Sequence, residues 1–309
     1  MTFSHLDLIC HWEFVICHFT FMTNRKLTYS IIILLVTLVV IVFSIIFSAR
    51  KNNLDVYFLN VGQGDAILIS EGQNQMLIDG GKDGRLLLQK LGKYIPFWDR
   101  KIEIVVATHP DQDHIGGLID VLRTYKVEKI LKTNAESDSE VYQKLKEVIS
   151  QKGLEKVDAK KDATVRFPGG TVASVLFPLT SLPEAVDEAS NDNSVAIKLV
   201  YGENSFLLTG DLPSAKETEL INSGVDIKSD VLKVGHHGSR YSTSDDFLSA
   251  INPTDTIISV GKNNSYGHPN QEVLDRLLRN KINILRTDEM GDIIYKCQSP
   301  ESKCAQVAN

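Results

Sequence analysis

The sequence predicts an α/β (α+β) fold in which two mixed β-sheets pack face to face with helices outside, preceded by one transmembrane helix. Three observations carry this prediction. Short runs rich in β-branched apolar residues alternate with amphipathic segments in both halves of the chain. Polar side chains follow the ends of several of these runs. A longer, uninterrupted apolar run lies near the N-terminus.

The apolar run from Tyr29 to Ser48 spans about 20 residues, which is enough to cross the hydrocarbon core of a membrane. The run is long for the apolar part of a signal peptide, and Phe47-Ser48-Ala49-Arg50 at its end is a poor cleavage site. We therefore expect an uncleaved anchor rather than a cleaved signal peptide or a buried helix. Two basic residues lie on each side of the run, and charge alone does not orient it. The short tail before it favours a single-pass protein of the cell membrane whose main domain is extracytoplasmic.

We expect four parts along the chain. These are an N-terminal tail at 1–28, the anchor at 29–48, a globular domain at 52–298 and a C-terminal tail at 299–309. Translation is expected to start at Met22, because a basic stretch and the apolar run follow that residue directly.

The globular domain is expected to begin with a hairpin. Residues 56–59 and 66–69 are predicted strands, joined by the turn Asn60-Val61-Gly62-Gln63-Gly64-Asp65. The glycines could indicate a phosphate loop, but no helix and no Lys-Ser/Thr pair follow them, so a hairpin turn is the better interpretation. A third strand at 76–78 ends in Asp79-Gly80-Gly81.

The stretch Thr108-His109-Pro110-Asp111-Gln112-Asp113-His114-Ile115-Gly116-Gly117 places four potential metal ligands within six positions. It follows a predicted buried strand at 102–107 and precedes a predicted helix at 118–122, which puts it where α/β proteins commonly bind ligands. Alternate residues of an extended loop point the same way, so His109, Asp111 and Asp113 can converge, and His114 can reach a second ion. Imidazole and carboxylate ligands suit zinc, manganese or iron. The alternative is a charged surface loop.

Further helices and strands alternate to the end of the chain. Helices are expected at 84–91, 140–150, 214–222, 247–251 and 271–280. Strands are expected at 172–177, 195–201, 206–209, 231–234, 256–260, 283–285 and 292–295. Residues 181–193 form a polar, acidic loop that is long enough to be functional or mobile.

Three later polar positions also follow predicted strands. Asp211 follows the strand at 206–209, the pair His236-His237 follows the strand at 231–234, and His268 comes after the strand at 256–260. Singly, each has an ordinary interpretation, since such an Asp often caps a helix and a His before Pro is often a loop residue. Their recurrence after strands favours a second half of the same polar cluster.

The composition limits the possible partners. The net charge of −6 gives no global basic field for nucleic acid. Five scattered cations are candidates for phosphate contact, although each is expected to be a solvated surface charge: Lys51, Lys82, Arg85, Lys233 and Arg240. The four cysteines, Cys10, Cys17, Cys297 and Cys304, lie outside the ligand cluster, which argues against a thiolate site. The last two could pair in an oxidising compartment or stay free.

Taken together, the motifs resemble the metallo-β-lactamase superfamily and, within it, the hydrolase domain of ComEC-type competence proteins of DNA uptake. The resemblance covers residues 54–296. It rests on Asn60-Val61-Gly62-Gln63-Gly64-Asp65-Ala66, Ile78-Asp79-Gly80-Gly81, the stretch from Thr108 to Gly117, Thr209-Gly210-Asp211, Gly235-His236-His237-Gly238-Ser239 and Tyr266-Gly267-His268-Pro269. It implies an αββα sandwich with one or two divalent ions, Zn²⁺ or Mn²⁺, at one edge of the paired sheets.

The resemblance also assigns the ligands. It gives His109 and Asp111 to one metal position and Asp113 and His114 to the other, with Asp211 bridging the two ions. Asp111 departs from the superfamily's usual loop, His-x-His-x-Asp-His, by replacing its second His. The superfamily's usual later His falls at Asn193-Ser194. Both changes weaken the first position, and an oxygen-rich site tolerates manganese better than a three-His site does.

The remaining roles follow from the same resemblance. One of His236 and His237 is expected to complete the second metal position, and the other to contact phosphate. His268 is expected to line the site as a donor or ligand, and His237 or His268 could protonate the leaving oxygen. Asp113, His237 and His268 are thus the expected catalytic residues. Five residues are expected to support the ligands from behind: Asp79, Asp65, Asn193, Ser194 and Ser239.

The expected function is that of a metal-dependent hydrolase in which the ions activate water and clamp a phosphodiester. The resemblance suggests DNA as the substrate and DNA-uptake machinery as a partner. Two alternatives remain, because one fold hosts many chemistries. One is a hydrolase of another cell-envelope ester, such as a phosphocholine ester or a lactone. The other is a non-catalytic metal-binding adaptor. The sequence does not indicate the oligomeric state.

Overall fold

The computed structural model describes residues 25–49, 53–184 and 190–307. The chain divides into two compact units, one ending at Arg50 and the other beginning at Lys51. The predicted tail before residue 25 and the expected start at Met22 lie outside the described residues.

Helix α1 (Arg25–Ala49) coincides with the predicted anchor. Its segment Leu27–Ser44 has a mean hydropathy of 2.7 and is long and apolar enough to cross a membrane, and its side chains are not buried against protein. Thr37 donates its hydroxyl to the Ile33 carbonyl at 2.8 Å, so its polar group is satisfied within the helix. α1 is therefore a candidate membrane span by length and composition.

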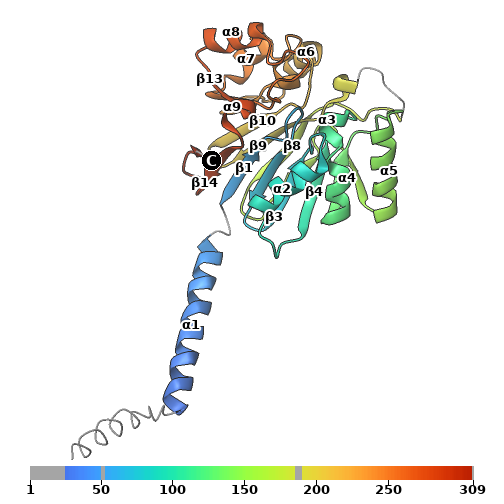
Figure 1. Cartoon of the computed structure of the whole chain (residues 1–309). Coiled ribbons are helices and arrows are strands. Elements are labelled where there is room, and N and C mark those ends of the chain that lie inside the picture. Colours follow the sequence, from blue (N-terminus) through green and yellow to red (C-terminus); the bar gives the residue numbers. More distant parts are fainter. Residues whose placement is uncertain (1–24, 50–52, 185–189, 308–309) are drawn as a thin grey trace, which may run out of the picture. The chain divides into compact units, whose positions relative to one another are not determined.

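The second unit contains two mixed β-sheets (Figure 1). The first has eight strands in the order β15-β14-β1-β2-β3-β4-β5-β6. Its strands are β1 (Leu54–Phe58), β2 (Ile67–Glu71), β3 (Asn74–Ile78), β4 (Lys101–Ala107), β5 (Lys126–Lys132), β6 (Glu155–Asp158), β14 (Ile293–Cys297) and β15 (Ala305–Val307). The strands from β3 to β6 run parallel, whereas β1 and β2 form the predicted hairpin.

The second sheet has seven strands in the order β13-β12-β11-β10-β9-β8-β7. They are β7 (Thr164–Arg166), β8 (Val172–Phe177), β9 (Ala196–Tyr201), β10 (Asn204–Leu208), β11 (Val231–Lys233), β12 (Asp255–Ile258) and β13 (Asn283–Arg286). The strands from β10 to β13 run parallel. Their carboxyl ends consequently lie at one edge of this sheet.

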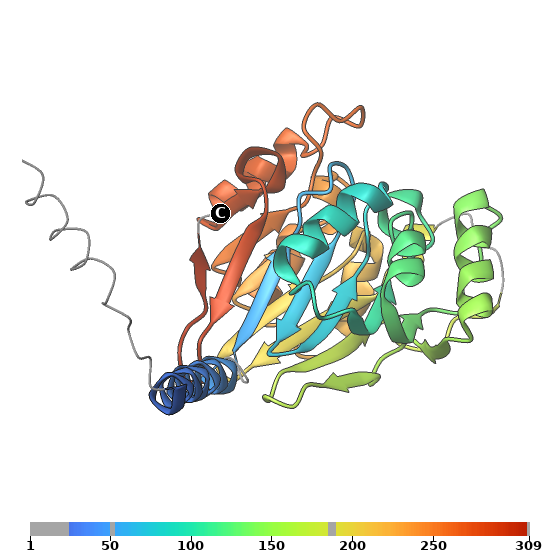
Figure 2. The ribbon, with the colours of Figure 1, turned by 60° about the horizontal axis from the view of Figure 1, so that its bottom comes forward.

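Helices cover the outer faces of the two sheets (Figure 2). Side chains alternate across β1, so Val56 and Phe58 join the core between the sheets while Tyr57 packs under the helices. The first sheet is covered by α2 (Gly84–Tyr94), α4 (Leu118–Thr124) and α5 (Glu140–Lys152). The second is covered by α6 (Ser214–Asn222), α7 (Asp245–Ile251) and α8 (Gln271–Arg279). The predicted sandwich with helices outside is confirmed.

Four features differ from the expectations. Strands β5, β6 and β7 were not predicted, because charged residues interrupt their apolar pattern. A 3₁₀ helix, η1 (Ser190–Asn193), occupies part of the expected polar loop. A short helix, α3 (Gln112–Ile115), replaces part of the expected extended metal loop. β15 pairs with β14, so the domain extends beyond residue 298. The Cys297–Cys304 disulfide links the last residue of β14 to the residue just before β15.

Candidate metal centre

The predicted ligands gather at the edge where strands from both sheets end. β4 leads to His109 and α3, β10 leads to Asp211, and β11 leads to η2 (Gly235–Gly238), which carries His236 and His237. A parallel strand delivers the residue after its carboxyl end to this edge. Residues that are far apart in the sequence therefore share one buried region.

Three histidines have their tautomers fixed by hydrogen bonds at Nδ1. His237 Nδ1 lies 2.9 Å from the Ser259 carbonyl, and His114 Nδ1 lies 2.8 Å from Asp79 Oδ2. Both oxygens can only accept, so both nitrogens carry hydrogen. Thr108 donates its single hydroxyl hydrogen to Asp79 and must therefore accept from His109 Nδ1 at 3.0 Å.

The opposite nitrogens converge on one carboxylate oxygen. Asp211 Oδ2 lies 3.4 Å from the Nε2 atoms of His114 and His237. The same oxygen lies 3.9 Å from His109 Nε2 and 3.8 Å from His236 Nε2. The structure thus brings together four histidines around Asp211.

Two groups can be distinguished around this oxygen. In the first, Asp113 Oδ2 lies 3.3 Å from His237 Nε2, which in turn lies 3.3 Å from His114 Nε2. We call Asp113, His114, His237 and Asp211 the His114 set. In the second, Asp111 Oδ2 lies 3.7 Å from His109 Nε2. We call His109, Asp111, His236 and Asp211 the His109 set.

The donor atoms fit divalent cations. His109 Nε2 and Asp211 Oδ1 are buried and have no hydrogen-bond partner among the described residues. When their Nδ1 atoms carry hydrogen, the neutral rings of His114 and His237 point lone pairs at each other, an arrangement that a cation or a proton must relieve. Nitrogen and carboxylate donors with Nδ1–H held from behind are the usual ligands of zinc and manganese.

Asp65 offers a second way to group the same atoms. Asp65, His114, Asp211 and His237 each provide a ligand atom within 4.8 Å of the others. However, Asp65 faces the Nδ1 atom of His237 at 3.5 Å and that of His114 at 3.9 Å, and both nitrogens carry hydrogen. Its carboxylate is also paired with the buried ammonium of Lys233. Asp113 is therefore the better fourth member of the His114 set.

The pKa values of the histidines shift in opposite directions in the two sets. Burial alone would lower the pKa of His237, but Asp211, Asp113 and Asp65 raise it to about 9. In His114, the carboxylates of Asp211 and Asp79 likewise overcome burial and raise the pKa well above its usual value. Burial and the neighbouring His114 lower the pKa of His109 to about 4. The His114 set thus attracts positive charge, while His109 stays a neutral donor.

The carboxylates are held in their ionised form. Burial would raise the pKa of Asp211, yet His237 and His114 bring it well below its usual value. Burial is outweighed in the same way at Asp113, where contact with His237 lowers the pKa. Ionised carboxylates are the form that binds cations.

The backbone around the site adopts unusual conformations. Asp79, His236 and His237 have φ angles of 56°, 47° and 53°, a region that residues other than glycine seldom occupy. A Cβ on Gly64 would lie 1.9 Å from the Asp113 carbonyl oxygen, so only glycine fits between the hairpin turn and α3. Strain of this kind commonly accompanies functional sites.

Four further residues that the sequence predicted for the site, Asn193, Ser194, Ser239 and His268, lie outside the two sets. Ser194 Oγ accepts from the Asp211 backbone N–H at 3.1 Å and approaches His109 Nδ1, whereas Asn193 is buried beside it. The His268 ring centroid lies 5.5 Å from that of His236. The Ser239 hydroxyl accepts from the Tyr241 backbone N–H at 3.4 Å, a contact that stabilises the turn after η2 rather than a ligand.

Two results differ from the sequence prediction. Asp113 lies in the helical turn of α3, so the alternation of an extended loop does not place it, although it still reaches His237. Lys233 was expected to be a solvated charge and is instead fully buried, donating to the Gly210 carbonyl at 2.9 Å. The sequence did contain a signal for this burial, because Lys233 is a single lysine inside an apolar strand. A lysine is rarely buried in such a strand unless a partner of opposite charge is buried with it.

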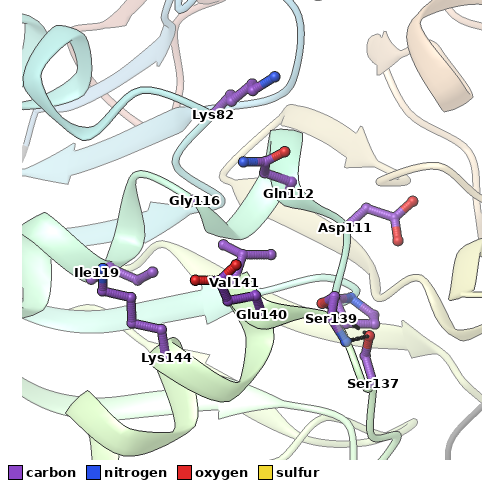
Figure 3. Close-up of a pocket in the computed structure, with 11 residues that line it drawn as sticks. Lys82, Asp111, Gln112, Gly116, Ile119, Ser137, Ser139, Glu140, Val141 and Lys144 are labelled. Atoms are coloured by element: carbon purple, nitrogen blue, oxygen red, sulfur yellow. Dashed lines mark hydrogen bonds between the residues drawn. The ribbon is translucent and has the colours of Figure 1, made fainter.

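A polar hollow of about 530 Å³ opens beside Asp111 (Figure 3). Asp111 belongs to both the hollow and the His109 set, so the hollow leads away from the candidate metal centre. Lys82 and Lys144 lie on opposite sides of it, and Gln112, Ser137 and Glu140 also line it. Neither lysine has an ion pair among the residues that the structure describes.

The paired sheets with an Asp/His cluster at their common edge define a candidate metal-dependent hydrolase of the αββα class. The family model described as the metallo-beta-lactamase superfamily matches residues 59–262. The chain therefore belongs to this superfamily, which confirms the resemblance seen in the sequence.

Two curated relatives and one solved structure are similar to the chain. ComE operon protein 3 of Bacillus subtilis (strain 168) is 34% identical over 262 residues, covering 78% of this chain and 33% of the relative. Competence protein ComA of Neisseria gonorrhoeae is 28% identical, covering 79% and 32%. The chain thus spans about a third of these relatives' length. The metallo-beta-lactamase fold protein YhfI from Bacillus subtilis has a TM-score of 0.52 at 11% identity, covering 79% and 99%, and shares the fold.

Proposed function

We propose that this protein is a membrane-anchored, metal-dependent phosphodiesterase that cuts DNA in a competence-related process. The single observation that carries the proposal is the convergence of four Nε2 atoms on Asp211 Oδ2. This arrangement supports two neighbouring cation positions that share one bridging carboxylate, which is the layout used for in-line displacement at phosphorus.

The His114 set and the His109 set are the proposed ligands of the two positions, which assigns one member of the His236-His237 pair to each. Divalent cations bound there would supply Lewis acidity and lower the pKa of coordinated water. Asp79 fixes the His114 ring and, through Thr108, the His109 ring. Because the ligands are oriented before binding, the site loses little freedom when it fills.

His268 is the proposed proton donor to the leaving oxygen. His237 is held among Asp113, Asp211 and the Ser259 carbonyl, which suits a ligand better than a residue that must reach substrate. His268 stands one ring further out, beside His236, and its Nδ1 atom is buried without a partner among the described residues. Its position beside His236 and outside the two sets is what supports this role.

DNA is the proposed substrate on two grounds. The relatives include a protein named for competence, which supports a role in DNA uptake. The hollow beside Asp111 offers Lys82 and Lys144 to phosphates on either side of the reacting one. A small ester would need no such extension.

The domain is proposed to lie outside the cytoplasm on a single-pass anchor. α1 is long and apolar enough to span a membrane. The Cys297–Cys304 disulfide favours an oxidising compartment, because cytosolic thiols are kept reduced.

The test compares three substrate classes with one preparation. Purified full-length protein is incubated with Mn²⁺ or Zn²⁺ and either linear DNA, a nitrophenyl phosphocholine ester or a lactone. We expect metal-dependent cleavage of DNA that EDTA abolishes. Turnover of only the phosphocholine ester or the lactone would assign a different ester substrate, and metal binding without any turnover would indicate an adaptor.

A further inference from the structure

An exposed aromatic pair marks one end of the domain. Phe97 and Trp98 are 80% and 60% exposed, and their ring centroids lie 4.9 Å apart in an edge-to-face contact. They form the tip of the turn between α2 and β4. Two adjacent, exposed aromatic side chains form a small apolar patch, and such patches commonly mark a site of contact with a protein or a membrane.

The turn is held in place by Asp99. Its carboxylate accepts from the Gln75 side-chain amide at 3.2 Å and from the Lys101 backbone N–H at 3.1 Å. The Asp99 backbone N–H closes the turn on the Pro96 carbonyl at 2.8 Å. The two rings are thus presented outward on a supported turn.

The topology places this turn at the end of the sheet where the chain enters the domain. β1 is antiparallel to β2, β2 is antiparallel to β3, and β3 is parallel to β4, so β1 and β4 start at the same end. Figure 1 shows the turn before β4 and the start of β1 at that end. Four residues, 50–53, connect Ala49 of α1 to Leu54, a tether of at most about 18 Å.

Two unpaired cations accompany the aromatic rings. Arg100 lies two residues after Trp98, and its backbone carbonyl accepts from the backbone N–H of Lys126 at 2.8 Å. Both side chains are exposed, and neither has an ion pair among the described residues. Aromatic rings flanked by basic side chains are characteristic of protein surfaces that contact the lipid headgroups of a membrane.

We propose that Phe97, Trp98, Arg100 and Lys126 form a membrane-contact surface that rests in the lipid headgroup region. This inference depends on the proposed anchor, because α1 supplies the membrane next to which Leu54 starts. The candidate metal centre lies at the opposite ends of β1 and β4, roughly 20 Å away along the strands. The contact would therefore orient the metal centre away from the lipid, so that substrate arrives from the aqueous side.

The test uses the intrinsic fluorescence of Trp98 in full-length protein reconstituted into phosphatidylethanolamine–phosphatidylglycerol liposomes. The sequence has two tryptophans, and Trp12→Phe leaves Trp98 alone. We expect brominated lipid to quench Trp98 and acrylamide to quench it poorly. A matched control introduces Tyr241→Trp into a chain that also carries Trp12→Phe and Trp98→Phe. Tyr241 is 72% exposed and follows η2 at the metal end, so its replacement should show the reverse pattern.

Flotation of the same liposomes tests the membrane anchor separately from the membrane-contact surface. Protein that floats, with Trp98 as accessible to acrylamide as the residue introduced by Tyr241→Trp, would overturn the contact surface while leaving the anchor standing. Protein that fails to float would overturn the anchor and the contact surface together. Flotation with lipid quenching confined to Trp98 is the result that the inference predicts.

Discussion

The Nε2 atoms of His114 and His237 face each other across 3.3 Å in the buried edge shared by the two sheets. The Asp79 carboxylate holds Nδ1–H of the first ring, and the Ser259 carbonyl holds that of the second. Two neutral rings in this arrangement would direct lone pairs at one another. The pair is stable only when positive charge lies beside it, which is the property expected of metal ligands.

Asp79→Asn should weaken metal binding without unfolding the domain. The Asp79 carboxylate accepts from the Thr108 backbone N–H at Oδ1 and from the Thr108 hydroxyl and His114 Nδ1 at Oδ2. An amide has only one accepting oxygen, so one of these two positions becomes an NH₂ group and the set of contacts that holds the His114 ring is broken. Asparagine tolerates the positive φ of 56° at this position, which makes it the conservative choice. Losing such a supporting carboxylate typically costs about 10–100-fold in metal affinity. A chelator competition assay measures this change, and unchanged affinity would remove Asp79 from the proposed support.

Lys233→Met should destabilise the metal-free protein. It leaves the carboxylates of Asp65 and Asp211 buried without their shared cation, and breaking a buried ion pair typically costs about 3–5 kcal/mol. Urea denaturation in EDTA measures the free energy of unfolding. The double variant Lys233→Met/Asp65→Asn should recover part of the loss. A single variant as stable as the unmodified protein would contradict the pairing.

Lys82→Gln/Lys144→Gln should raise KM for DNA and reduce its salt dependence, because each lost phosphate contact lowers the slope of binding against salt. Turnover of a small nitrophenyl phosphodiester should stay unchanged, since it does not extend along the hollow. Lys152→Gln, at the opposite end of α5 from the hollow, is the matched control. Equal loss with both substrates would place the effect in the metal centre instead.

Asp292 provides a test of stability against pH away from the metal centre. Burial alone would raise its pKa, but hydrogen bonds from Lys90, Tyr94 and the Asn60 N–H lower it below the usual 3.8. When the pKa of a carboxyl group is lower in the folded protein than in the unfolded chain, its ionised form stabilises the fold at pH values above the pKa of the unfolded chain. This stabilisation is lost as the pH falls through the pKa of the folded protein. Asp292→Asn should therefore reduce stability at pH 7, and the difference should shrink below pH 3.8. A difference that is independent of pH would refute this account.

Much of the fold could be predicted because the periodicity of apolar residues within single segments indicates helices and strands. In β1, successive side chains point to opposite faces of the sheet. Val56 and Phe58 therefore face the core between the sheets, and Tyr57 faces the layer under the helices. The weakly patterned strands could not be predicted in this way. β5 (Lys126–Lys132) alternates lysine and glutamate with apolar residues, and its place in the sheet depends on pairing with β4.

The candidate site could be predicted in its residues but less well in its geometry. The motifs after β4, β10 and β11 identified the histidines and carboxylates that the structure brings together. They did not separate the roles of His236 and His237, because the positive φ angles that turn these rings towards different sets are set by the fold. Nor did they indicate the burial of Lys233, whose partners Asp65 and Gly210 lie on other strands' loops.

The most direct test of the central claim is the metal content of purified protein, measured by inductively coupled plasma mass spectrometry after equilibration with Mn²⁺ or Zn²⁺. The account predicts two ions per chain, with both lost in Asp211→Ala and the folded circular dichroism spectrum retained. Asp246→Asn, an exposed acid on α7, should leave the content unchanged. Protein that binds no divalent ion, or that retains both ions after Asp211→Ala, would contradict the claim that the two sets share Asp211.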